Sequence, residues 1–94
     1  MIAEQETVRM KRFIRTCIAC PSQWEGELDD GRWLYVRYRG GRFSVSWMTS
    51  EGVIGERFHE TDFGDRLDGW LSDEEMLTHL PSWIGTRGVE FRHD

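Results

Sequence analysis

Ninety-four residues make one small domain, spanning residues 1–94, whose modest core leaves little room for a deep enzyme cleft. Five tryptophans, five phenylalanines and two tyrosines supply apolar area, and the presence of only two prolines argues against disorder. The net charge is −5, and residues 49–94 hold eleven acidic against four basic side chains; this balance excludes a non-specific nucleic-acid binder, which needs an excess of lysine and arginine.

The first predicted element follows a polar start. Residues 1–10 lack a clear hydrophobic period, so we expect a flexible segment or a short helix there. A strand is the first choice for residues 11–19. A short helix is the alternative, because Met10, Phe13, Ile14 and Cys17 also fit the spacing of one helical face. Pro21 ends this element.

The second predicted strand covers residues 22–28, and its register with the next strand depends on the turn at Gly31. A two-residue loop would turn the carboxylates of this strand toward apolar partners. A three-residue loop with Gly31 in a left-handed conformation pairs Leu28 with Arg32 and places Trp24 opposite Val36. The hydrophobic pattern therefore selects the three-residue loop.

A two-residue turn at Gly40 and Gly41 is predicted to join the strands 33–39 and 42–48. This turn pairs residues 39 and 42, 38 and 43, 36 and 45, and 34 and 47. One face of the resulting three-stranded meander is continuously apolar. The predicted core consists of Trp24, Leu28, Leu34, Val36, Tyr38, Phe43, Val45 and Trp47.

The remaining chain is predicted to add one or two strands and a helix. A fourth strand follows at residues 53–58, and the acidic residues 59–70 are expected to form a loop. Ser72 and Glu75 have the spacing of a capping box, which opens a helix over residues 72–80 that stops near Pro81. Residues 88–93 fit a last strand. The sequence thus predicts an α+β fold, a small antiparallel sheet packed by one C-terminal helix.

The face of the meander opposite the predicted core is rich in aromatic and arginine side chains. Two interpretations make this face structural: its side chains pair across the strands, or the helix or the N-terminal segment covers it. The functional interpretation is an interface, because Trp, Tyr and Arg dominate binding hot spots. The candidate binding residues are Trp33, Tyr35, Arg37, Arg39 and Arg42.

The acidic half of the chain provides a second candidate surface. Its carboxylates resemble the phosphates of a nucleic acid in charge, so they suit a basic host protein. The alternative is a solvated surface that keeps a small protein soluble. The candidate residues are Glu60, Asp62, Asp65 and Asp68, extended by residues 73–75.

No catalytic constellation stands out, so we expect the protein not to be an enzyme, and we expect no cofactor. Cys17 and Cys20 have the spacing of two zinc ligands, but no second such pair is present. Two small buried residues are the more common outcome for this pattern, and no metal is expected. Glu25 and His59 are the side chains suited to acid–base work, and nothing in the sequence brings them together.

The segment from Cys17 to Trp47 contains the stretches CPSQWEG, DG and YVRYR. It resembles a segment of small uncharacterised proteins of bacteriophages and actinobacteria, and it covers about a third of the chain. No established activity or functional residue accompanies that group. The resemblance implies only a context, in which small phage accessory proteins act by binding a host protein or a host signal.

These observations lead to two functional hypotheses. The first is a non-enzymatic binding protein, a phage accessory or counter-defence inhibitor that binds a host protein through the aromatic and arginine face. The alternative is a protein that sequesters a nucleotide or other small anion, with a pocket formed at the interface of a homo-oligomer. The absence of a long apolar run or a signal-peptide pattern predicts a cytoplasmic protein of the bacterial host, without membrane contact.

Overall fold

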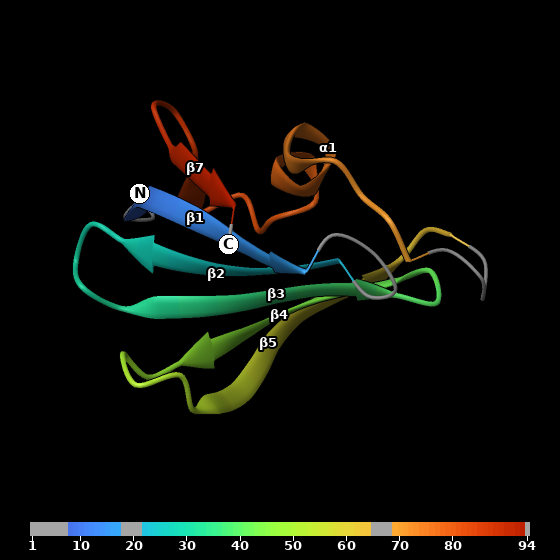
Figure 1. The fold of residues 1–94 in the computed structure, drawn as a ribbon, viewed down its shortest axis with the longest axis horizontal. Helices are drawn as coiled ribbons and strands as arrows, with labels where there is room; N and C mark the ends of the chain where they lie inside the picture. Colours follow the sequence, from blue (N-terminus) through green and yellow to red (C-terminus); the bar gives the residue numbers. More distant parts are fainter. Residues whose placement is uncertain (1–7, 18–21, 65–68, 94) are drawn as a thin grey trace, which may run out of the picture.

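The computed structural model describes residues 8–17, 22–64 and 69–93 of the chain (Figure 1). Within these residues the chain forms strands in almost every segment, with one short helix after the fifth strand. The elements are β1 (Val8–Cys17), β2 (Ser22–Leu28), β3 (Trp33–Arg39), β4 (Arg42–Met48), β5 (Ile54–Asp62), α1 (Asp73–Thr78), β6 (Ile84–Gly85) and β7 (Glu90–His93).

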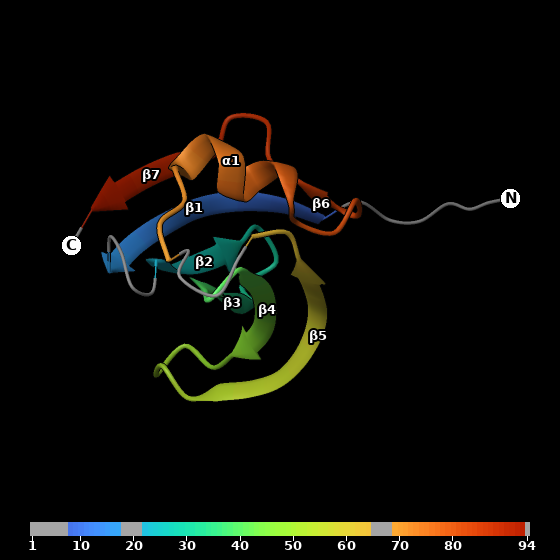
Figure 2. The ribbon, with the colours of Figure 1, turned by 90° about the vertical axis from the view of Figure 1, so that its right-hand side faces the viewer.

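All seven strands belong to one curled sheet. Strands β1 to β5 lie in chain order with antiparallel neighbours, and Figure 2 shows them following a curve from β1 to β5. The second edge of β1 pairs in parallel with β6 and then with β7. The sheet is therefore mixed, and β1 has sheet partners on both sides.

The predicted α+β class is wrong, because the fold is mostly β: 60% of the described residues lie in strands and 8% in helix. The capping box predicted at Ser72 and Glu75 does open α1, but the helix has six residues and buries Met76 alone. So short a helix is a single segment packed on the sheet and not a layer that covers it. The predicted strand at residues 88–93 forms as β7, but its parallel pairing with β1 also makes the sheet mixed instead of antiparallel.

The predicted register of the meander is confirmed. Trp24 lies opposite Val36, and the Gly40–Gly41 turn places Val36 opposite Val45. At the first turn the amide of Leu28 donates to the carbonyl of Arg32 at 2.8 Å, which is the predicted three-residue loop. The hydrophobic pattern, which favours the three-residue loop, therefore predicts the register of β2 to β4 correctly.

The conformation of Gly31 provides a direct test of this turn. Its φ of 94° lies in the left-handed region, and no atom lies within 4 Å of the position that a Cβ would occupy. Gly31→Ala is therefore expected to lower the free energy of unfolding by about 1 kcal/mol, through backbone strain alone. A urea titration measures the change. Gly31→Asn, which tolerates this conformation better, should retain more of the stability, and equal losses would contradict the strain explanation.

Strand β1 settles the alternatives left open at the N-terminal side. Residues 11–17 form a strand and not a helix, and residues 8–10, predicted to be flexible or a short helix, belong to the same strand. Residues 1–7 lie outside the described part of the chain. A break in register between Met10 and Arg12 brings Met10 and Phe13 to the buried face. Because of this irregularity the apolar spacing of β1 resembles that of a helix.

Strand β5 is longer than predicted. The sequence predicts a strand at residues 53–58 and a loop from residue 59, whereas β5 continues to Asp62. Its pairing with β4 is irregular between Val45 and Ser46, where Arg57 and His59 face successive residues of β4. The irregularity turns both Phe58 and His59 toward the aromatic side chains of the core, where they lie next to Trp47 and Phe43 respectively.

The hydrophobic core lies between the sheet and the segment that contains α1 and β6. Seven of the eight predicted core residues are buried, whereas Trp47 is only partly buried beside the core. Trp24 is completely buried, and its indole Nε1 donates to the carboxylate of Asp73 at 2.9 Å. Arg15, also buried, donates to the same carboxylate at 3.0 Å. These bonds fasten the start of α1 to β1 and β2.

No helix in the described part of the chain has the length and apolar character needed to cross a membrane.

Candidate functional site

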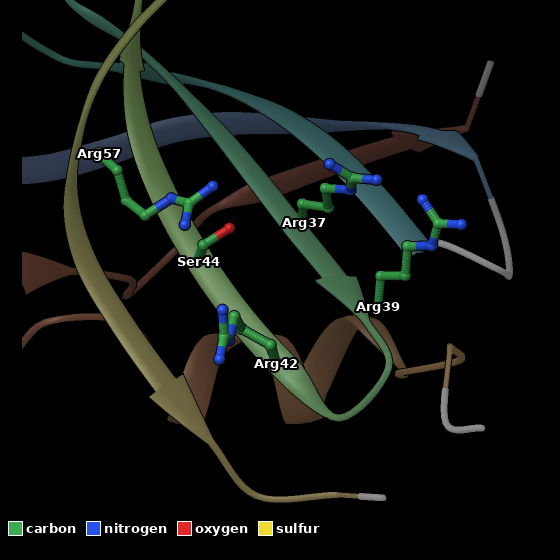
Figure 3. Close-up of a pocket in the computed structure, with 5 residues that line it drawn as sticks. All are labelled: Arg37, Arg39, Arg42, Ser44 and Arg57. Carbon is green, nitrogen blue, oxygen red and sulfur yellow. The ribbon is translucent and has the colours of Figure 1, made fainter. Parts of the chain in front are cut away.

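The sheet face opposite α1 carries the residues that the sequence analysis selected for binding. Because side chains alternate along a strand, Trp33, Tyr35, Arg37 and Arg39 of β3 share one face. The paired residues of β4 extend the same face, and Arg42 lies beside Arg39. Figure 3 shows these arginine side chains on the near side of the sheet, with α1 behind it. The helix therefore does not cover this face.

Four arginines from three neighbouring strands surround one pocket on this face (Figure 3). The pocket has a volume of about 230 Å³ and opens to solvent. We call it the arginine pocket, and its lining residues are Arg37, Arg39, Arg42, Ser44 and Arg57. Three of the five predicted binding residues thus contribute to one site, whereas Trp33 and Tyr35 do not line it.

Arg57 is a member of the pocket that the sequence analysis missed. It enters the site because β5 pairs with β4 so that Arg57 lies opposite Ser46. The predicted fourth strand included Arg57, but the irregular pairing that decides its face could not be derived from the hydrophobic pattern. In a regular strand, the alternation of side chains between the two faces would have predicted the face of Arg57. The pairing of β5 with β4 is irregular, so this alternation does not hold along β5.

Two carboxylates of β5 hold part of the arginine pocket in place. Arg42 lies 3.1 Å from Asp62 and 3.3 Å from Glu60, and Arg57 lies 3.1 Å from Glu60. Hydrogen bonding to Asp62 raises the pKa of Arg42 above its usual value, so Arg42 stays charged. Glu60 and Asp62 were predicted as part of a separate acidic surface, but they lie beside the arginines. Asp65 and Asp68 fall outside the described residues.

Arg37 and Arg39 differ from the other two arginines of the pocket. Neither forms an ion pair with a carboxylate of the described residues. The Nε atom of Arg37 is shielded from solvent and has no hydrogen-bond partner. A buried donor without an acceptor is costly in a folded protein. Arg37 and Arg39 are therefore the two arginines of the pocket whose charge no carboxylate of the described residues compensates.

A tyrosine with two polar neighbours lies next to the arginine pocket. Glu25 is opposite Tyr35 and Gln23 is opposite Arg37 in the pairing of β2 with β3. Burial raises the pKa of the Tyr35 hydroxyl, while the Arg37 charge acts in the opposite direction. The hydroxyl therefore stays protonated at neutral pH. We call Tyr35, Gln23 and Glu25 the tyrosine shelf.

The remaining candidates from the sequence are not brought together. Cys17 ends β1, Cys20 lies outside the described residues, and the described part of the chain contains no group of three side chains suited to a metal ion. His59 forms a 2.9 Å hydrogen bond through Nε2 with the carbonyl of His79, on the core side of the sheet. Glu25 lies on the other face, so these two residues form no acid–base pair.

Comparison of this chain with protein families, with curated proteins and with solved structures finds no match. The resemblance around Trp24 therefore remains a prediction, and no functional residue is transferred from another protein.

Proposed function

We propose that this protein is a binding protein whose arginine pocket holds a phosphate-bearing anion. The observation that carries the proposal is that four arginines, from β3, β4 and β5, line one pocket. A guanidinium presents several donors in a planar fork that matches the oxygens of a phosphate or carboxylate. Four such groups from three strands suit an anion with several oxygens better than a single carboxylate.

The charge balance of the site supports an anionic ligand. Like charges that lie close together repel one another, so clustered arginines require compensation. Glu60 and Asp62 compensate Arg42 and Arg57, while Arg37 and Arg39 receive no such carboxylate from the described residues. The pocket thus keeps an excess of positive charge in a chain whose net charge is −5. A bound dianion would complete the balance.

The size of the pocket indicates which part of a ligand it holds. Pockets for whole drug-sized ligands measure about 300–1,000 Å³. At about 230 Å³, the arginine pocket suits one or two phosphate groups, with the rest of the ligand lying outside it on the sheet. We further propose that the protein acts by sequestering this ligand, in the cytoplasm of a bacterial host and without catalysing its conversion.

A host protein remains the second candidate partner, with one observation in its favour. Val53 and Ile54 are 62% and 51% exposed, and Ile54 pairs with Met48 at the end of β4 away from Arg42. Exposed apolar side chains and arginines are both common in protein interfaces. A partner that presents a phosphate or carboxylate to the arginine pocket would use both features, either as a host protein or as a second copy of this chain.

Calorimetric titration of the full chain with pyrophosphate tests the proposal. We expect binding, and we expect Arg37→Gln combined with Arg39→Gln to weaken it at least about tenfold, because a hydrogen bond to a charged group contributes about 1.5–3 kcal/mol. Arg92→Gln is the matched control, since Arg92 is an exposed arginine of β7 paired with Glu90 and lies outside the pocket.

The control should bind pyrophosphate as the wild type does. No binding by the wild-type chain, or equal weakening by Arg92→Gln, would contradict a phosphate site at the arginine pocket. Repeating the titration at higher salt should weaken binding further, because exposed charges are screened.

A further inference from the structure

We propose that the ligand of the arginine pocket is a nucleotide whose base lies on the tyrosine shelf. This inference rests on the proposed function and adds the chemical class of the ligand. It comes from the position of Tyr35 and its neighbours relative to the pocket. The phosphate would lie among the arginines, the sugar between the two parts of the site, and the base against the Tyr35 ring.

The spacing along β3 supports this placement. Tyr35 and Arg37 are two residues apart on one strand and face the same side of the sheet, which separates them by about 6.5 Å along the strand. Arg37 lines the arginine pocket, so the ring lies one side-chain position beyond the pocket rim. This offset matches the reach from a 5′-phosphate across a ribose to its base. Aromatic rings accept bases by stacking, whatever the base.

The neighbours of Tyr35 provide hydrogen-bonding groups for the edge of a base. Glu25 is partly exposed, and its carboxylate forms no hydrogen bond or ion pair with the described residues. A carboxylate only accepts hydrogen bonds, so it selects a base edge that offers donors. Guanine offers two adjacent donors, its ring N–H and its amino group, whereas adenine offers only its amino group on that edge. The geometry therefore favours a guanine nucleotide.

Trp33 is a weaker candidate for the base. It lies two residues beyond Tyr35 on the same strand, farther from the arginines. Its partner on β2 is Glu27, whose carboxylate is already engaged by Arg12 and Lys11. The Glu25 carboxylate is the one that remains available on this face of β2. Tyr35 is thus the better candidate, because it lies closer to the arginine pocket and is opposite the available carboxylate of Glu25.

Titration of the full chain with four probes tests the inference: GMP, AMP, ribose 5-phosphate and pyrophosphate. We expect GMP to bind about tenfold more tightly than ribose 5-phosphate, because base stacking adds to phosphate binding. Tyr35→Leu should abolish that difference and leave pyrophosphate binding unchanged, whereas Tyr35→Phe should keep it. Glu25→Gln should reduce the preference for GMP over AMP, because an amide offers a donor and only one acceptor.

The outcomes separate this inference from the function on which it rests. If GMP and ribose 5-phosphate bind equally and pyrophosphate still binds, the ligand is not recognised as a nucleotide. The proposal of a phosphate site at the arginine pocket would then still hold. Binding of none of the four probes would overturn both. A preference for AMP that Glu25→Gln does not change would overturn the assignment of guanine. Far-ultraviolet circular dichroism of each variant verifies the fold, and the conservative variants Tyr35→Phe and Glu25→Gln keep the test decisive if Tyr35→Leu unfolds.

Discussion

Replacement of Trp24 by alanine is expected to lower the free energy of unfolding by about 3–5 kcal/mol. The side chain is completely buried among the largest residues of the core, so its removal creates a cavity that the sheet cannot close. It also removes the hydrogen bond from the indole to Asp73 and the contact of Arg15, whose guanidinium lies 4.6 Å from the centre of the ring. Folded proteins are stable by only about 5–15 kcal/mol, so this variant should be largely unfolded on warming.

Urea unfolding followed by circular dichroism measures the loss, and Trp70→Ala is the matched control. Trp70 is 55% exposed, so the same truncation there should cost about 1 kcal/mol or less. Trp24→Phe should fall between the two, because it keeps most of the volume and loses the hydrogen bond. Similar losses for Trp24→Ala and Trp70→Ala would show that Trp24 does not occupy the centre of the core.

Removal of the Asp73 carboxylate is expected to have a comparable effect for an electrostatic reason. Arg15 is only 5% exposed, and its guanidinium donates to Asp73 and to the carbonyl of Leu71. Removal of one partner of a buried ion pair costs about 3–5 kcal/mol, because the remaining charge loses its nearest compensation in a place shielded from water. Asp73→Ala should therefore destabilise the protein by about that amount, as measured by urea unfolding.

Two further variants test this explanation. Asp62→Ala removes a carboxylate from an exposed pair with Arg42, so it should change stability by at most about 1 kcal/mol. The double variant Arg15→Met with Asp73→Ala should be more stable than Asp73→Ala alone, because it no longer buries a charge that has lost its Asp73 carboxylate. A double variant less stable than the single one would contradict the electrostatic reason and point to lost packing.

The meander could be predicted because its determinants are local. Gly31 and the Gly40–Gly41 pair set the turns, and the alternation of apolar residues then leaves one register that buries Trp24 opposite Val36. The same alternation correctly placed Arg37, Arg39 and Arg42, three of the four arginines of the pocket, on the face away from the core. Short-range turn chemistry was enough for this part of the site.

The rest required information that a local pattern does not contain. The face on which Arg57 lies depends on an irregularity where β5 pairs with β4. The buried position of Arg15 depends on Asp73, which is 58 residues away in the chain. The parallel pairing of β7 with β1 is equally remote and has no turn signature. The predicted helix was too long, because a capping box marks where a helix starts and says little about where it ends.

Strand β1 pairs in antiparallel fashion along one edge and in parallel along the other, and this difference bears on the order of folding. Its antiparallel partner β2 follows almost at once in the chain, whereas its parallel partners β6 and β7 come from the far end of the described sequence. Pairings between remote segments form slowly, because a long loop must close first. Because β1 to β5 are synthesised before Glu90–His93, they can pair with one another while part of the outer edge of β1 has no partner. The nascent protein thus exposes an unpaired sheet edge, the kind of edge that promotes association with another chain, until its last strand is in place.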